Sequence, residues 1–189
     1  MDLAEAIFSE AAGAVRGLAD VDGHVYAVSF FVYDEDDDPR RPTLTVGYNT
    51  VEHWQQTVSQ ASSAAEAKWN YAFWPQNEIA SFGRSGTPSE ATVAEWLRER
   101  GLSYTDEQAD ADLDATLELD ERITEQFVEA CCSAARRLQS EGVVSQALSE
   151  QVPVLVHELE YYDAIANQNE RCNPPGVADD FVRWVRSDA

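Results

Sequence analysis

Lysine is almost absent from this chain: Lys68 is the only one among thirteen basic residues. Against these stand 35 aspartates and glutamates, which leaves a formal net charge of −22 over 189 residues. A potential this negative repels phosphate groups, so the composition argues against direct binding of nucleic acid and of membranes. It suits a basic protein partner, a cation, or a host cytoplasm adapted to high salt, and a general solubility charge explains it equally well.

Cysteine and long apolar runs are also scarce. The three cysteines, Cys131, Cys132 and Cys172, form no even framework, which indicates a reducing compartment. No apolar stretch reaches the roughly 18 residues that a membrane-spanning helix needs. Residues 1–20 have the spacing of an amphipathic helix rather than of a signal peptide. We therefore predict a cytoplasmic protein.

The sequence lacks the familiar catalytic motifs. It has no G-x-S-x-G elbow and no phosphate-binding loop, since GRSG at 83–86 lacks the required lysine. The pair His157-Glu158 is followed by Tyr161 where an H-E-x-x-H zinc motif would place its second histidine. We therefore predict no catalytic residue, no cofactor and no metal centre of this kind, and we leave enzymatic activity as the less favoured possibility.

The apolar residues that are present predict an α+β fold. Hydrophobic residues make up 44% of the chain, enough for a single domain over residues 1–189. Helical spacing is clearest at residues 2–18 and 119–140. His24–Tyr33 predicts a strand buried on both faces, and Thr43–Tyr48 predicts its antiparallel hairpin partner. Trp69–Trp74 predicts a strand or an extended turn, with the end of a helix as the alternative. Together with Val152–Leu159, these segments predict a small, mostly antiparallel sheet of three to four strands packed with five to six helices.

The segment DADLDATLELDE at 110–121 resembles a calcium-binding loop. Such a loop places oxygen ligands at positions 1, 3, 5, 7, 9 and 12. Those positions are occupied by Asp110, Asp112, Asp114, Thr116, Glu118 and Glu121. Position six, however, is alanine where the sharp turn requires glycine. The alternative is a solvated acidic segment whose carboxylates favour the start of the following helix.

Two segments mix aromatic rings with amide side chains: KWNYAFWPQNE at 68–78 and HELEYYDAIANQNE at 157–170. Such surroundings suit a ligand pocket, and they also suit core aromatics whose polar tips are hydrogen-bonded. The structural interpretation is favoured. The residues that would line a pocket are Trp69, Tyr71, Trp74, His157, Tyr161 and Tyr162.

An acidic interface is the main alternative to a pocket. The run Asp34, Glu35, Asp36, Asp37 and Asp38 forms the most concentrated charge, and residues 106–121 form a second acidic stretch. Either could steer a basic partner toward the protein.

Several segments resemble an uncharacterised bacterial family. They are KWNYAFW, PVLVHELEYYD and NPPGVADDFVRWV, together with the strand and acidic loop HVYAVSFFVYDEDDD. Proteins similar to this family occur among candidate immunity proteins encoded near polymorphic toxins. The resemblance covers most of the chain and implies a protein-binding role, and it carries over no catalytic residue.

Three functions follow, in this order. The first is an immunity-like or antitoxin-like module that binds a basic protein. The second is a small enzyme or ligand-binding domain from a salt-adapted host. The third is calcium binding at 110–121.

Overall fold

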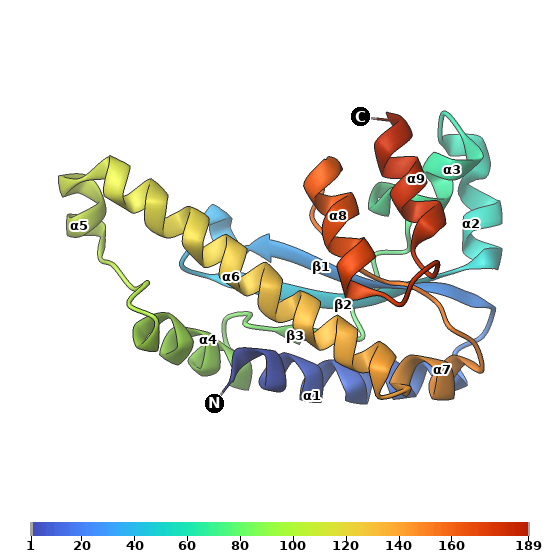
Figure 1. Ribbon diagram of the computed structural model, residues 1–189, viewed down its shortest axis with the longest axis horizontal. Helices are drawn as coiled ribbons and strands as arrows, with labels where there is room; N and C mark the ends of the chain where they lie inside the picture. The colour runs from blue at the N-terminus through green and yellow to red at the C-terminus, as the bar shows by residue number, and fades with distance from the viewer. Residues whose placement is uncertain (1, 189) are drawn as a thin grey trace.

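The computed structural model describes residues 2–188 and has the predicted α+β architecture (Figure 1). A four-stranded sheet in the order β3-β2-β1-β4 carries helices on both faces. The strands are β1 (Val25–Asp34), β2 (Pro42–Thr50), β3 (Ala80–Phe82) and β4 (Val154–His157). The helices in the described residues number nine rather than five to six: α1 (Leu3–Arg16), α2 (Val51–Thr57), α3 (Ala64–Trp69), α4 (Pro88–Glu99), α5 (Asp106–Ala111), α6 (Leu113–Ser140), α7 (Val143–Leu148), α8 (Asp163–Cys172) and α9 (Asp179–Asp188).

The sheet is mixed, which corrects the mostly antiparallel sheet expected from the sequence. β1 and β2 form the predicted antiparallel hairpin, with Val28 opposite Tyr48 and Phe30 opposite Val46. β4, in contrast, pairs with β1 in parallel. The chain reaches β4 only after a long helical crossover, and such a connection can bring a strand back in the same direction, which a short hairpin cannot.

The local patterns were weak at two places, where one expected strand is absent and one strand was not expected. Trp69–Trp74 is not a strand: it is the end of α3 followed by the short 3-10 turn η4 (Tyr71–Phe73). β3 has only three residues, too few to show an alternating pattern in the sequence. Further 3-10 turns are η1 (Gly17–Asp20), η2 (Glu35–Asp37) and η3 (Val58–Gln60).

A separate hydrophobic core lies on each face of the sheet. On one face, α1, α4 and α6 pack on Val28, Phe30 and Leu44, and the free thiols Cys131, Cys132 and Cys172 lie buried among them. On the opposite face, α3, α8 and α9 enclose a core rich in aromatic rings, which come from Tyr26, Trp69, Tyr71, Trp74, Phe181 and Trp184. The best strand of the sequence, β1, is therefore buried on both faces, as its composition predicted.

The outer edge of β4 is closed by side chains rather than by another strand. Asn169 accepts from the Val156 N–H at 2.8 Å and donates to the Val156 carbonyl at 2.8 Å. One helical turn later, Asn173 accepts from the Val154 N–H at 2.8 Å and donates to its carbonyl at 3.0 Å. The two amides thus replace a neighbouring strand and satisfy a buried backbone edge.

The longest helix, α6, extends beyond the sheet and forms an arm with α5 (Figure 1). It begins at Leu113, earlier than the predicted start at 119, because the Asp112 side chain accepts from the Ala115 N–H at 3.1 Å and caps it. Residues 113–118 are mostly exposed, so they present no buried apolar stripe from which the sequence could predict a helix. We call residues 106–122 the arm.

Candidate functional site

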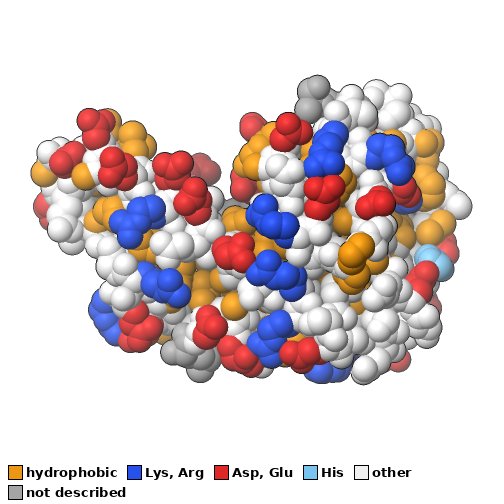
Figure 2. Space-filling view, viewed as in Figure 1, with side chains coloured by type: hydrophobic (Ala, Val, Ile, Leu, Met, Phe, Trp, Pro, Cys, Tyr) orange, Lys and Arg blue, Asp and Glu red, His pale blue; other side chains and the backbone are white. Residues whose placement is uncertain are grey.

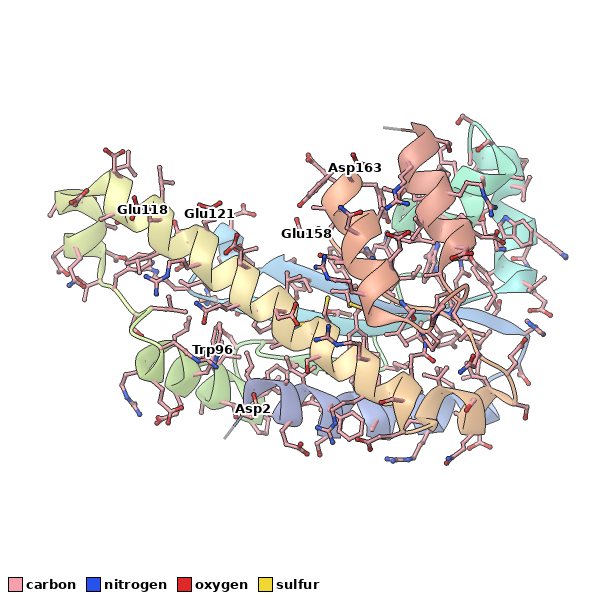
Figure 3. All side chains as sticks on the ribbon, viewed as in Figure 1. Asp2, Trp96, Glu118, Glu121, Glu158 and Asp163 are labelled. Carbon is pink, nitrogen blue, oxygen red and sulfur yellow. The ribbon has the colours of Figure 1, made fainter. Side chains whose placement is uncertain are left out.

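A hollow of about 340 Å³ lies where β1 ends, between α6 and the segment that leads to α8. Its lining combines four consecutive strand residues, the following acidic loop, α6 and the chain after β4: Phe31, Val32, Tyr33, Asp34, Asp37, Thr124, Glu158, Leu159 and Glu160. Figure 3 shows Glu118 and Glu121 on α6, facing Glu158 and Asp163 across this gap. We call the hollow and these two walls the acidic notch. The red side chains on both walls are visible in Figure 2.

The notch contains a carboxylate in an unfavourable setting. The pKa of Asp34 is raised from 3.8 to about 6, chiefly by burial and then by the nearby charges of Glu158 and Asp120. Burial also raises the pKa of Glu158, with a contribution from the charge of Glu160. Among the ion pairs of residues 2–188, none neutralises Asp34 or Glu158. A positive charge placed in the notch would therefore interact favourably with these carboxylates.

The carboxylates of the acidic run at 34–38 fall into two groups, because some pair with arginines of the same turn and others line the hollow. Arg41 binds Glu35 at 2.6 Å and also pairs with Asp36, while Arg40 binds Asp38 at 2.8 Å. These arginines hold a loop in which Asp36 and Asp37 adopt positive φ of 60° and 57°. Asp34 and Asp37 line the hollow instead. Only part of the predicted acidic interface is thus available to an outside cation.

Large exposed hydrophobic side chains occur on the arm and on the segment between β4 and α8. In the described chain these are Leu113, Leu117, Leu159 and Tyr162, with exposed fractions of 66%, 56%, 69% and 44%. Leu113, Leu117 and Thr124 are spaced by four and seven residues, so they share one face of α6. Because Thr124 lines the hollow, this face leads from the arm into it. Exposed apolar groups beside unpaired charges are typical of an interaction surface.

We expect Leu113→Ser and Leu117→Ser to change the free energy of unfolding by no more than about 0.5 kcal/mol, because the two side chains are already in solvent. Ile123→Ala, on the buried side of the same helix, should cost about 2–4 kcal/mol. Urea denaturation followed by circular dichroism measures both. A large loss of stability in the leucine variants would show that these residues support the arm rather than an interaction.

The aromatic residues predicted to form a pocket are mostly in the core. Trp69, Tyr71 and Trp74 are buried, and Tyr161 packs against the same cluster, whereas Tyr162, the residue before α8, is exposed. Tyr71 and His157 have ring centroids 5.0 Å apart. The side chains converge, yet they do so by packing against one another.

His157 has a buried partner that the sequence did not indicate. Its Nε2 lies 2.8 Å from the Ser29 Oγ, and its Nδ1 lies 2.9 Å from the Glu158 carbonyl oxygen. The exposed fractions of Ser29 and His157 are 0% and 3%. A substrate would have to open the core to reach this serine–histidine pair, so its geometry supports a structural role.

Burial lowers the pKa of His157 from 6.5 to about 4. Between pH 4 and 6.5, His157 is therefore protonated in the unfolded chain but neutral in the folded chain. The free energy of unfolding consequently decreases as the pH falls from 6.5 to 4. The contribution of this residue is about 3 kcal/mol over that window. We expect the stability of the wild type relative to His157→Gln to decline over this range in urea titrations. A difference in stability that stays constant over this range would contradict the assignment.

The predicted calcium-binding segment does not form a loop. Asp110 lies in α5, Asp112 caps α6, and Asp114, Thr116, Glu118 and Glu121 lie within α6. Without glycine at position 115 the backbone continues as a helix, which spreads the last four residues around and along its axis. Within residues 2–188, no group of three or more His, Cys, Asp or Glu side chains is placed to hold a metal ion.

No family model matches this chain, and searches of the curated proteins and of the solved structures also found no match. Over the described residues, no helix combines the length and the apolar character needed to cross a membrane. The geometry of the notch is therefore the main basis for a functional proposal.

Proposed function

We propose that the chain is a protein-binding module that receives a basic segment of a partner protein in the acidic notch. The observation that carries this proposal is the half-buried Asp34 carboxylate, which lies in a hollow with Glu158 nearby and no compensating cation. An arginine or lysine from a partner would supply the missing charge. The relief of repulsion would then contribute to binding.

The surroundings of Asp34 fit such a contact. The carboxylates on the two walls would attract a basic protein over long range and accelerate its association. Apolar surface that a partner could bury is provided by Leu113, Leu117 and Leu159. The immunity-like role implied by the resemblance is one form of this function, with a basic toxin as the partner.

Two variants of equal charge test the proposal. Glu118, Glu121 and Glu158 are changed to glutamine in the notch variant, whereas Asp20, Asp22 and Glu99 are changed to their amides in the control. Each variant shifts the net charge from −22 to −19, since three negative charges are removed. Tagged proteins are used to capture partners from the host lysate, and the captured proteins are quantified by mass spectrometry.

We expect one basic protein in near-equimolar amount with the wild type and the control, and at least tenfold less with the notch variant. Association rates measured with that protein should fall with salt for the wild type, and more weakly for the notch variant. Equal capture by both variants would contradict a role for the notch.

A further inference from the structure

The two central strands of the sheet end at different places. β1 continues to Asp34, while the last residue of β4, His157, lies opposite Phe31. Val32–Asp34 therefore has β2 on one side, paired as far as Asp34 with Pro42, and no β4 residue on the other. The acidic hollow lies at this position, because Phe31–Asp34 forms part of its lining.

Successive N–H groups of β1 point alternately toward β2 and toward β4, and this decides which of them face the side that β4 leaves open. The Val28 N–H donates to the Pro153 carbonyl at 2.9 Å, toward β4. The N–H groups at two-residue intervals point to the same side, so that of Val32 faces the last residue of β4, His157, and that of Asp34 lies beyond the end of β4. The Glu35 N–H, in contrast, donates to the Arg41 carbonyl at 3.0 Å across the hairpin. The Asp34 N–H is therefore directed toward the hollow.

We propose that the hollow is a strand-addition site, where an extended partner segment with arginine or lysine at alternate positions pairs with β1 at Val32–Asp34. This inference rests on the proposed function and specifies how the notch binds its partner. Addition of a strand to an open sheet edge is a common mode of peptide recognition, in which backbone hydrogen bonds give affinity and alternate side chains give specificity.

Charge and size identify the occupant. Asp34, Asp37, Glu158 and Glu160 surround the open edge, so the added segment must be cationic. A second copy of this chain, with its own net charge of −22, would be repelled. Three strand residues span about 10 Å at roughly 3.3 Å each, and a hollow of about 340 Å³ accommodates a segment of this length.

The alternating side chains of the added strand would meet two different walls. One set would face α6 at Thr124, and the other would face Phe31, Tyr33 and Leu159. An alternating basic and apolar sequence would place cations by the carboxylates and small apolar groups against the strand and Leu159. This pattern defines the probe.

The probe is the peptide acetyl-Arg-Val-Arg-Val-Arg-amide, compared with the same peptide methylated at its valine amides. Methylation keeps the charge and removes backbone donors. Binding to the full-length protein is measured by calorimetry at low salt, and exchange of the Asp34 amide is followed by NMR. We expect protection of that amide by the unmethylated peptide and at least tenfold weaker binding of the methylated one.

Two protein variants complete the test. Asp34→Pro removes the N–H directed to the hollow, and φ of −96° at this position is moderately close to the range of proline. Asp34→Asn removes the charge alone. We expect Asp34→Asn to weaken peptide binding and Asp34→Pro to abolish it; if the proline variant does not fold, the methylated peptide still decides the question.

Equal binding of the two peptides would overturn strand addition and leave charge alone as the attraction. If neither peptide binds while the notch variant still loses the captured partner, strand addition fails and the proposed function stands. If neither peptide binds and Asp34→Asn promotes self-association, the carboxylates only protect the edge from other strands. Failure of the wild type to capture any basic partner would instead contradict the proposed function itself.

Discussion

Asn169→Asp is expected to destabilise the protein by about 3 kcal/mol, because a carboxylate cannot replace the amide at the edge of β4. The Asn169 side chain is fully buried. Its Nδ2 donates to the carbonyls of Val156 and Ile165, both at 2.8 Å. Aspartate would retain the acceptor for the Val156 N–H, yet it would place a buried negative charge against two carbonyl oxygens.

Asn167→Asp is the matched control, since it makes the same chemical change on the same helix. Asn167 is exposed, and its Oδ1 accepts from Arg186 at 2.9 Å, an interaction that a carboxylate would keep. We expect a change within about 0.5 kcal/mol for this variant. Urea denaturation of both proteins at pH 7 gives the comparison. Similar small effects would show that α8 does not close the edge of β4 as described.

Asp34→Asn is expected to stabilise the isolated protein above pH 6 and to weaken partner binding by about tenfold. The pKa of Asp34 is raised to about 6, chiefly by burial, so the folded chain binds more protons than the unfolded chain between 3.8 and 6. Stability is therefore lost as the pH rises through this window, and the loss is complete above pH 6. Allowing for partial exposure of the group, the gain from the amide is about 1 kcal/mol at pH 7.5.

Asp38→Asn provides a control of opposite sign in the same loop. Hydrogen bonding to Arg40 holds the pKa of Asp38 below its usual value, so its charge stabilises the fold. Its loss should lower stability at pH 7.5, and this effect should disappear as the pH falls below the ordinary pKa of aspartate. Thermal unfolding at pH 4 and 7.5 distinguishes the two carboxylates. A destabilised Asp34→Asn at pH 7.5 would mean that the charge supports the fold, and the argument for a missing cation would fail.

Local patterns predicted the parts of the fold that depend on local chemistry. β1 is rich in valine and aromatics and lacks proline and glycine, and it forms the buried strand that this composition favours. Its hairpin with β2 was confirmed for the same reason. The parallel direction of β4 is set by a crossover of many helices, which no local pattern records. Asn169 and Asn173 were similarly hidden, because one-turn spacing of amides does not reveal that a sheet edge lies beside them.

The site could be predicted only in part. The sequence showed that the run at 34–38 is acidic. It did not show that some of these carboxylates pair with Arg40 and Arg41 while others line the hollow, because that depends on a turn with positive φ. Thr124 and Leu159 join the notch from segments that are distant in sequence. The six residues predicted for a pocket shared a composition that also suits a core. Four of them pack into the aromatic cluster, and the ring of His157 packs against two of these four, Tyr71 and Trp74. The composition identified the chemistry, and tertiary structure decided which groups remain available.

Hydrogen exchange of the full-length protein, with and without the basic partner it captures, measures the location of the interface most directly. We predict slower exchange on binding at Phe31–Asp34, at residues 113–124 and at residues 158–163, which together form the notch. Protection confined to the opposite end of the molecule, at α2 and α3, with unchanged exchange at Asp34, would contradict the assignment of the notch as the binding site.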